Sequence, residues 1–291
     1  MDLAQDGPVK LRTIDMIHTL LELPSTAADK DQSTFVTDAF NGVPVAASDN
    51  LPMIAAFNSE TGTEAQSAVV APEHLIIFSG NMSAEHKDYV TNSLLYSDLA
   101  AVYKTRQIAN VAQRRKAWYD EKTFVMKGLG WAGFTETLRE QSARSRKFTM
   151  DQVGLEILSK ALAAAAVPGI SAAALMSLAS EAIKVIGKGG EPLRLFQKEY
   201  RAHQDGKFNI AVCMESPTGD VVLVSTNIYF VASQSVTNVL FWEWQSTDVD
   251  VASAGNRMVL NERRFQRGKD KLADRLDDYM FDTILDLPLG R

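Results

Sequence analysis

Cys213 is the only cysteine of this 291-residue chain, and it lies in an apolar, strand-like run from Phe208 to Met214. A lone thiol forms no internal disulfide and no metal cluster by itself. Three roles remain open for it. Cys213 is an inert core group, because free cysteine is among the most buried residue types; it carries a fatty acyl chain as a thioester; or it is a nucleophile activated by a base.

The two reactive roles each need a partner in the fold. An acyl chain needs a pocket or tunnel between sheet and helices, where each buried methylene would contribute about 0.8 kcal/mol. A nucleophile needs a base, and His203 lies ten residues upstream, with His18, His74 and His86 elsewhere. Because no histidine has a spacing that enforces contact with Cys213, a cysteine-dependent acyltransferase or thioesterase-like enzyme is kept as an alternative.

A glycine-rich run at residues 128–133, Gly-Leu-Gly-Trp-Ala-Gly, has the spacing of a dinucleotide-binding turn. Trp131 is bulky where a phosphate would approach, and helical patterns flank the run instead of alternating strands and helices. We therefore interpret it as a turn anchored by Trp131. The sequence also lacks a His-Glu-x-x-His motif, a nucleophile elbow, a phosphate loop and paired cysteines. We predict a non-enzymatic protein with no catalytic, cofactor-binding or metal-ligating residues.

The net charge of −6 argues against nucleic-acid binding, which normally requires a basic face. Three basic clusters nevertheless stand out: Arg114-Arg115-Lys116; Arg139, Arg144, Arg146 and Lys147; and Arg263, Arg264, Arg267, Lys269 and Lys271. One interpretation is that each cluster is a solvated face. If several clusters lie on one side of the protein, they would attract it to an anionic phospholipid surface, at about 1 kcal/mol per residue. In that case Trp118 would lie at the depth of the lipid headgroups. The aspartates between Asp270 and Asp286 are interpreted as the polar face of the last helix.

The stretch Ala161–Ser180 contains no charged residue over 20 positions, which is the length that spans a bilayer. Nine of its residues are alanine and Pro168-Gly169 interrupts it, so a stable transmembrane helix is disfavoured. The stretch predicts a tightly packed helical hairpin inside the protein, or a hairpin that leaves the core and enters a membrane under a trigger. Small residues allow close packing of its two arms in either setting.

The elements that must position these residues follow from the hydrophobic periodicity. Helical spacing runs from Ser83 to about Asp120, as one long helix or two abutting ones, and residues 123–126 are β-prone. More helical patterns follow to about Tyr200. From Phe208 the period becomes two, Ser216–Asp220 predicts a hairpin turn, and a helix closes the chain.

These patterns predict an α+β fold, with a helix-rich N-terminal two-thirds packed on a C-terminal antiparallel β-sheet closed by a terminal helix. We expect a single domain over residues 1–291. It comprises an irregular arm with short elements at 1–80, a mainly helical region at 81–205, antiparallel strands at 206–260 and a helix at 261–287.

The first eight residues lack the basic and apolar regions of a secretory signal, and neither end carries a lipidation motif. We therefore expect the protein to be cytoplasmic in the producing cell or exported without a cleaved signal peptide, and to associate with membranes.

A single strand-borne cysteine, with helices before it and an antiparallel sheet around it, resembles the Erwinia virulence factor family. The resemblance implies a bacterial virulence protein that interacts with an insect host, has an α/β fold of unusual topology and carries palmitate as a thioester on Cys213. On this interpretation the protein acts at membranes, and the alanine-rich hairpin lines a tunnel for the acyl chain. The alternatives are the cysteine-dependent enzyme above and a pore-forming toxin whose hairpin inserts.

Overall fold

The computed structural model describes residues 55–58, 66–71, 73–140, 147–165, 171–187, 205–236, 239–245 and 247–285. Most of the arm predicted at residues 1–80, together with the helical pattern that ends near Tyr200, lies outside these residues.

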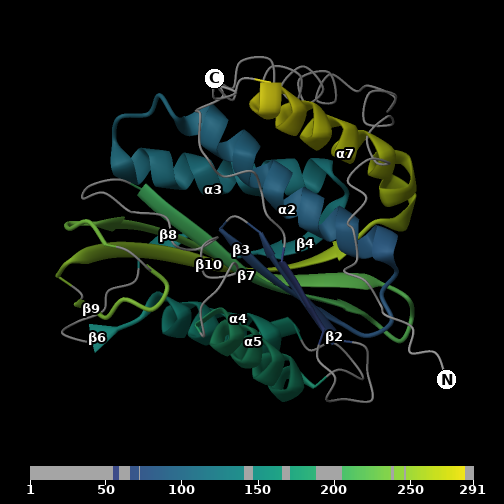
Figure 1. The fold of residues 1–291 in the computed structure, drawn as a ribbon, viewed down its shortest axis with the longest axis horizontal. Helices are drawn as coiled ribbons and strands as arrows, with labels where there is room; N and C mark the ends of the chain where they lie inside the picture. The colour runs from purple at the N-terminus through teal and green to yellow at the C-terminus, as the bar shows by residue number, and fades with distance from the viewer. Residues whose placement is uncertain are drawn as a thin grey trace, which may run out of the picture.

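A twisted β-sheet forms the middle of the protein (Figure 1). Its neighbouring strands pair antiparallel except for β3 and β7, which are parallel. The strand order across the sheet is β1 (Ala55–Asn58), β2 (Gln66–Ala71), β3 (His74–Ser79), β7 (Asp205–Glu215), β8 (Val221–Ala232), β10 (Val249–Leu260) and β4 (Trp131–Thr135), and β5 (Arg139–Glu140) also pairs with β10. A small separate sheet joins β6 (Lys147–Phe148) to β9 (Trp244–Gln245).

Helices cover both faces of the sheet (Figure 1). One face is covered by α2 (Ala84–Thr105), α3 (Val111–Gly128) and α7 (Glu262–Leu285), and the other by α4 (Met150–Ala165) and α5 (Ala172–Gly187). The two largest hydrophobic cores among the described residues therefore lie on opposite sides of the same strands, and a smaller cluster forms around Trp118, Tyr119 and Tyr229. We call the core beneath α4 and α5 the hairpin core, and the one beneath α2 and α7 the α2–α7 core.

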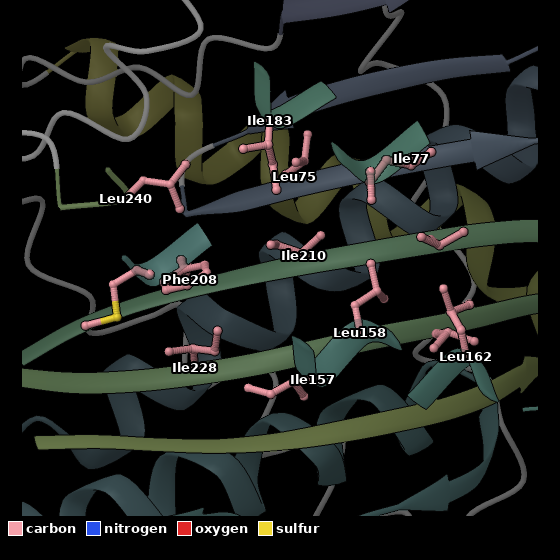
Figure 2. Close-up of a cluster of buried hydrophobic side chains, with 14 of the residues drawn as sticks. Leu75, Ile77, Ile157, Leu158, Leu162, Ile183, Phe208, Ile210, Ile228 and Leu240 are labelled. Atoms are coloured by element: carbon pink, nitrogen blue, oxygen red, sulfur yellow. The ribbon is translucent and has the colours of Figure 1, made fainter. Parts of the chain in front are cut away.

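Alternation along β7 decides which of its residues enters which core. Phe208, Ile210 and Val212 belong to the hairpin core, whereas Ala211 and Cys213 belong to the α2–α7 core. This follows from the two-residue period of a strand, which sends successive side chains to opposite faces. Figure 2 shows the hairpin core, to which Leu158 and Leu162 of α4 and Ile210 of β7 belong.

The predicted α+β class is confirmed, as are the paired strands after residue 206 and the terminal helix. The sheet also takes in strands from before the helices, because β3 pairs with β7 and β4 pairs with β10. The helical pattern from Ser83 is two helices, separated at residues 106–110. The β-prone assignment of residues 123–126 is wrong: they continue α3, where Val125 and Met126 extend the buried side begun by Trp118.

Candidate functional site

Cys213 lies in the middle of β7 with no exposed surface. Its partners in the neighbouring strands are Phe78 in β3 and Leu223 in β8, and all three belong to the α2–α7 core. Burial in this apolar setting raises the pKa of the Cys213 thiol far above its ordinary value. The thiolate that a nucleophile requires is therefore strongly disfavoured in the folded protein.

The hairpin and Cys213 lie on opposite faces of the sheet. Leu158, Leu162 and Ile183 of the hairpin contact the face that carries Val212, one residue before the cysteine. The expectation that this hairpin lines an acyl tunnel at Cys213 is therefore wrong. The reason is the strand period: a shift of one residue along β7 moves a side chain to the other core.

The two histidines in the described part of the chain have other partners. His74 pairs in the sheet with Asn209, four residues or about 13 Å along β7 from Cys213. His86, near the start of α2, places Nδ1 3.0 Å from the Ser83 hydroxyl and Nε2 3.1 Å from a Glu262 carboxylate oxygen. His18 and His203 lie outside the described residues. The arrangement of His74 and His86 gives the Cys–His enzyme hypothesis no base at the thiol.

A buried polar cluster that the sequence reasoning missed surrounds Asp98 of α2. Its carboxylate accepts hydrogen bonds from the Trp118 indole, at 3.1 Å, and from the Lys122 ammonium, at 3.0 Å. His74 Nε2 lies 2.9 Å from the same carboxylate. Burial by itself would raise the pKa of Asp98, but Lys122 and His74 outweigh it and hold that pKa well below its usual range.

This Asp98 cluster ties β3, α2 and α3 together inside the protein. The Lys122 side chain is only 4% exposed and His74 is buried, so the cluster has no open face for a substrate. A stabilising role fits this geometry. In the sequence, Asp98 follows Leu94 by four residues, which places a carboxylate on the apolar side of the predicted helix. That placement could have indicated a buried polar cluster.

Each residue of the first basic cluster is paired with a carboxylate, two of them from strands and one from the same helix. Arg114 makes two hydrogen bonds, of 2.6 and 2.9 Å, to Asp205. Arg115 pairs with Glu140, and Lys116 pairs with Asp120. The placement of Trp118 at headgroup depth is wrong, because that side chain is buried against Asp98.

The other two clusters are also partly paired. Lys147 lies 2.6 Å from Glu243, and Lys269 lies 2.8 Å from Glu85. Lys271 is buried, while Arg263 and Arg264 are exposed. Arg144 and Arg146 lie outside the described residues. The pairs made by Lys147 and Lys269 offset part of the positive charge of these two clusters.

The α4–α5 hairpin has an apolar inner side and a nearly neutral outer side. Leu158, Leu162, Leu175 and Ile183 are buried against the sheet. Small side chains are exposed on the outside, at positions Ser159, Ala163, Ala164, Ala173, Ala174 and Ser177. The nearest charges on the two helices are Glu156, Lys160, Glu181 and Lys184, with Lys160 bonded to Glu156 at 2.6 Å. Among the helices that the structure describes, none combines the length and apolar content of a bilayer span.

No protein-family model matches the chain, and no curated protein matches it by sequence. Among solved structures, the fold is similar to a delta-endotoxin, with a TM-score of 0.41, 12% identity, and coverage of 73% of this chain and 90% of that one. It is also similar to the Evf virulence factor, with a TM-score of 0.34, 11% identity, and coverage of 87% and 90%. Both likenesses are distant ones of fold, and neither assigns this chain a family, a ligand or an activity.

Proposed function

We propose that this protein acts at membranes through the α4–α5 hairpin, which separates from the sheet and packs against the lipid surface. The observation that carries the proposal is the 20-residue charge-free stretch at residues 161–180, which forms the ends of both helices and leaves alanine and serine facing outward. Outer faces of solvated helices normally carry charged residues. Within residues 161–180 the exposed alanine and serine side chains therefore contribute little desolvation cost when they meet lipid.

The inner face supplies the apolar surface that would enter the membrane. Leu158, Leu162, Leu175 and Ile183 are buried beneath the hairpin. Burial of each such side chain is worth about 1.5–3 kcal/mol, whether the apolar surroundings are protein or lipid. Exchanging one for the other therefore conserves most of this free energy for the hairpin side chains. The sheet face that the hairpin covers, which carries Ile210 and Val212, must meet the lipid as well, because exposing either surface to water would lose this free energy. An amphipathic helix of this kind lies in the membrane interface and does not have to span it.

The position of the hairpin also suits separation from the sheet. It is the helical cover of one face, and the α2–α7 core on the other face contains none of its residues. Trp242 is 42% exposed and lies beside Trp244, a member of the hairpin core. Tryptophan is favoured at membrane interfaces, where its ring and polar N–H are both accommodated.

Co-sedimentation with phosphatidylcholine vesicles, and with vesicles that also contain phosphatidylserine, tests the proposal. We expect binding to both, with a blue shift of Trp242 fluorescence, since Trp118, Trp131 and Trp244 are buried. Release of an entrapped dye would distinguish insertion that perforates the bilayer from surface attachment. If the wild-type protein binds neither kind of vesicle, the proposal fails.

A disulfide lock tests the hairpin itself. Figure 2 shows Ile183 of α5 beside Leu75 of β3, so cysteines at both positions would tie the hairpin to the sheet. We expect the oxidised Leu75→Cys/Ile183→Cys protein to lose vesicle binding and dithiothreitol to restore it, with Leu75→Cys alone as the control. Equal binding by the oxidised and reduced forms would contradict the proposed movement.

A surface substitution gives a second test without crosslinking. Ala164→Lys with Ala174→Lys places two charges on the exposed side of the hairpin and leaves its buried side unchanged. We expect vesicle binding to fall at least tenfold. Gln113→Lys, on exposed α3 surface, is the matched control and should bind like the wild type.

A further inference from the structure

A groove of about 600 Å³ runs between α3 and the outer edge of the sheet, and no residue of the α4–α5 hairpin lines it. Its buried floor is formed by Arg115, Tyr119 and Thr123, on one side of α3, and by Ala252 of β10. Its walls are exposed residues of α3 and of the segment that joins β4 to β5. The volume is that of a small-molecule site.

The groove is polar but carries no net charge. Three cations, Arg115, Lys116 and Lys127, line it together with three carboxylates, Asp120, Glu136 and Glu140. Arg115 reaches across from α3 to Glu140 on β5, and Lys116 pairs with Asp120 along the helix. An anion or a cation would have to compete with these pairs, so the groove selects for neither.

Hydrogen-bonding groups of both kinds converge on the same space. The lysines and the arginine donate, the carboxylates accept, and the Thr135 and Thr137 hydroxyls do both. Contacts to buried residues fix the wall formed by the β4–β5 segment. The Tyr119 hydroxyl lies 2.6 Å from the Glu136 carbonyl oxygen and 2.6 Å from Asn256 Oδ1. The Glu136 side chain in turn accepts from the Gly255 amide at 3.0 Å.

One wall adds a flat apolar surface. Phe124 lines the groove and is 42% exposed, although a phenyl ring gains nothing from contact with water. A ligand suited to all of these features is uncharged, carries several hydroxyls that each donate and accept, and has an apolar C–H face for the ring. Those are the properties of a pyranose sugar.

We propose that this groove binds a neutral sugar, free or at the end of a glycan. Ring hydroxyls would donate to Glu136 and Glu140 and accept from Arg115 and Lys127, while the C–H face of the sugar packs on Phe124. The site is separate from the hairpin, so its test is independent of membrane binding.

Saturation-transfer difference NMR tests the site with glucose, galactose, mannose and N-acetylglucosamine as probes. We expect saturation of ring protons in at least one of them, with a millimolar Kd by titration. Phe124→Ala should weaken that binding at least fivefold. Phe134→Ala is the matched control, because Phe134 is 65% exposed on β4 and does not line the groove.

Glu140→Gln provides a second variant, since it removes a charged acceptor from an exposed position. Glu140→Gln should also weaken the binding of whichever sugar gives a signal. Circular dichroism should show that both variants are folded. Three results would overturn the inference: no saturation transfer to any of the four sugars, equal binding by Phe124→Ala and the wild type, or tighter binding of glucosamine or glucuronate than of glucose.

Discussion

At the scale of single residues, burial governs what each reactive group can do. Cys213 has the intrinsic chemistry of a nucleophile or an acyl carrier, yet its thiol lies among apolar side chains of the α2–α7 core, which raises its pKa. A thioester with palmitate on this residue stays a prediction. It requires the core around Phe78 and Leu223 to open and receive a long chain.

The native thiol of Cys213 should therefore not react with dithionitrobenzoate at pH 8, and should react fully in denaturing urea, because a buried thiol is inaccessible and remains protonated. Intact mass spectrometry on the same sample decides the acyl question. A mass equal to the bare chain excludes the thioester in that preparation. An excess mass that hydroxylamine removes, with no free thiol in urea, would establish it.

Asp88 of α2 provides a pH-dependent case. Burial and the neighbouring Glu85 raise the pKa of its carboxyl to about 6. The folded state thus binds this proton more tightly than the unfolded chain does. The free energy of unfolding accordingly falls as the pH rises from about 4 to about 6, and it stays lowered above that range.

Replacement by Asn removes this penalty. Because solvent screens the partly buried carboxyl, we expect Asp88→Asn to raise the Tm at pH 7.5 by roughly 2–4 °C, the shift that about 1 kcal/mol produces in a chain of this size. The gain should shrink towards pH 4.5, and Asp270→Asn, exposed on α7, should show no such pattern. A gain of equal size at both pH values would rule out this cause.

At the scale of elements, the Asp98 cluster fixes how α2 and α3 pack on β3. Lys122 and Asp98 are both buried, so the charge of each is compensated by the other. Removing one partner from a buried ion pair typically costs about 3–5 kcal/mol, because a charge is left without compensation. Replacing both by apolar residues of similar volume is often far less costly.

We therefore expect Asp98→Leu and Lys122→Met each to lower the free energy of unfolding by about 3–5 kcal/mol, and the double variant to lose less than the sum of the two. Urea denaturation of the four proteins measures this. Strict additivity of the two losses would show that the pair is not coupled. Lys116→Met, which breaks an exposed pair with Asp120, is the control and should cost about 0–1 kcal/mol.

In the molecule as a whole, the two largest cores lie on opposite faces of one sheet and have no buried side chain in common. The α2–α7 core contains the single thiol, while the hairpin core is covered by two helices that carry no charged residue within positions 161–180. This division allows one layer to move while the other keeps the sheet folded. The proposed sugar groove lies beside α3 at the sheet edge, and no residue of the α4–α5 hairpin lines it.

Charge distribution at this scale sets the kind of membrane contact we propose. Arg114, Arg115 and Lys116 are adjacent in sequence, but each is paired with a different carboxylate in the fold. Attraction to lipid would then come from apolar burial beneath the hairpin more than from net positive charge, which is why binding to neutral vesicles is expected.

Local periodicity was enough to predict three features: the antiparallel strands after residue 206, the terminal helix and the helices on either side of the charge-free stretch. Those patterns depend on neighbours within a few positions, so they survive without any knowledge of long-range contacts. Three features could not be predicted and became visible in the folded protein: β3 pairs with β7, Cys213 and the hairpin lie on opposite faces of the sheet, and His74, Asp98 and Lys122 meet. Such pairings depend on the register and face of strands far apart in the chain, and moving a strand by a single residue reverses the outcome.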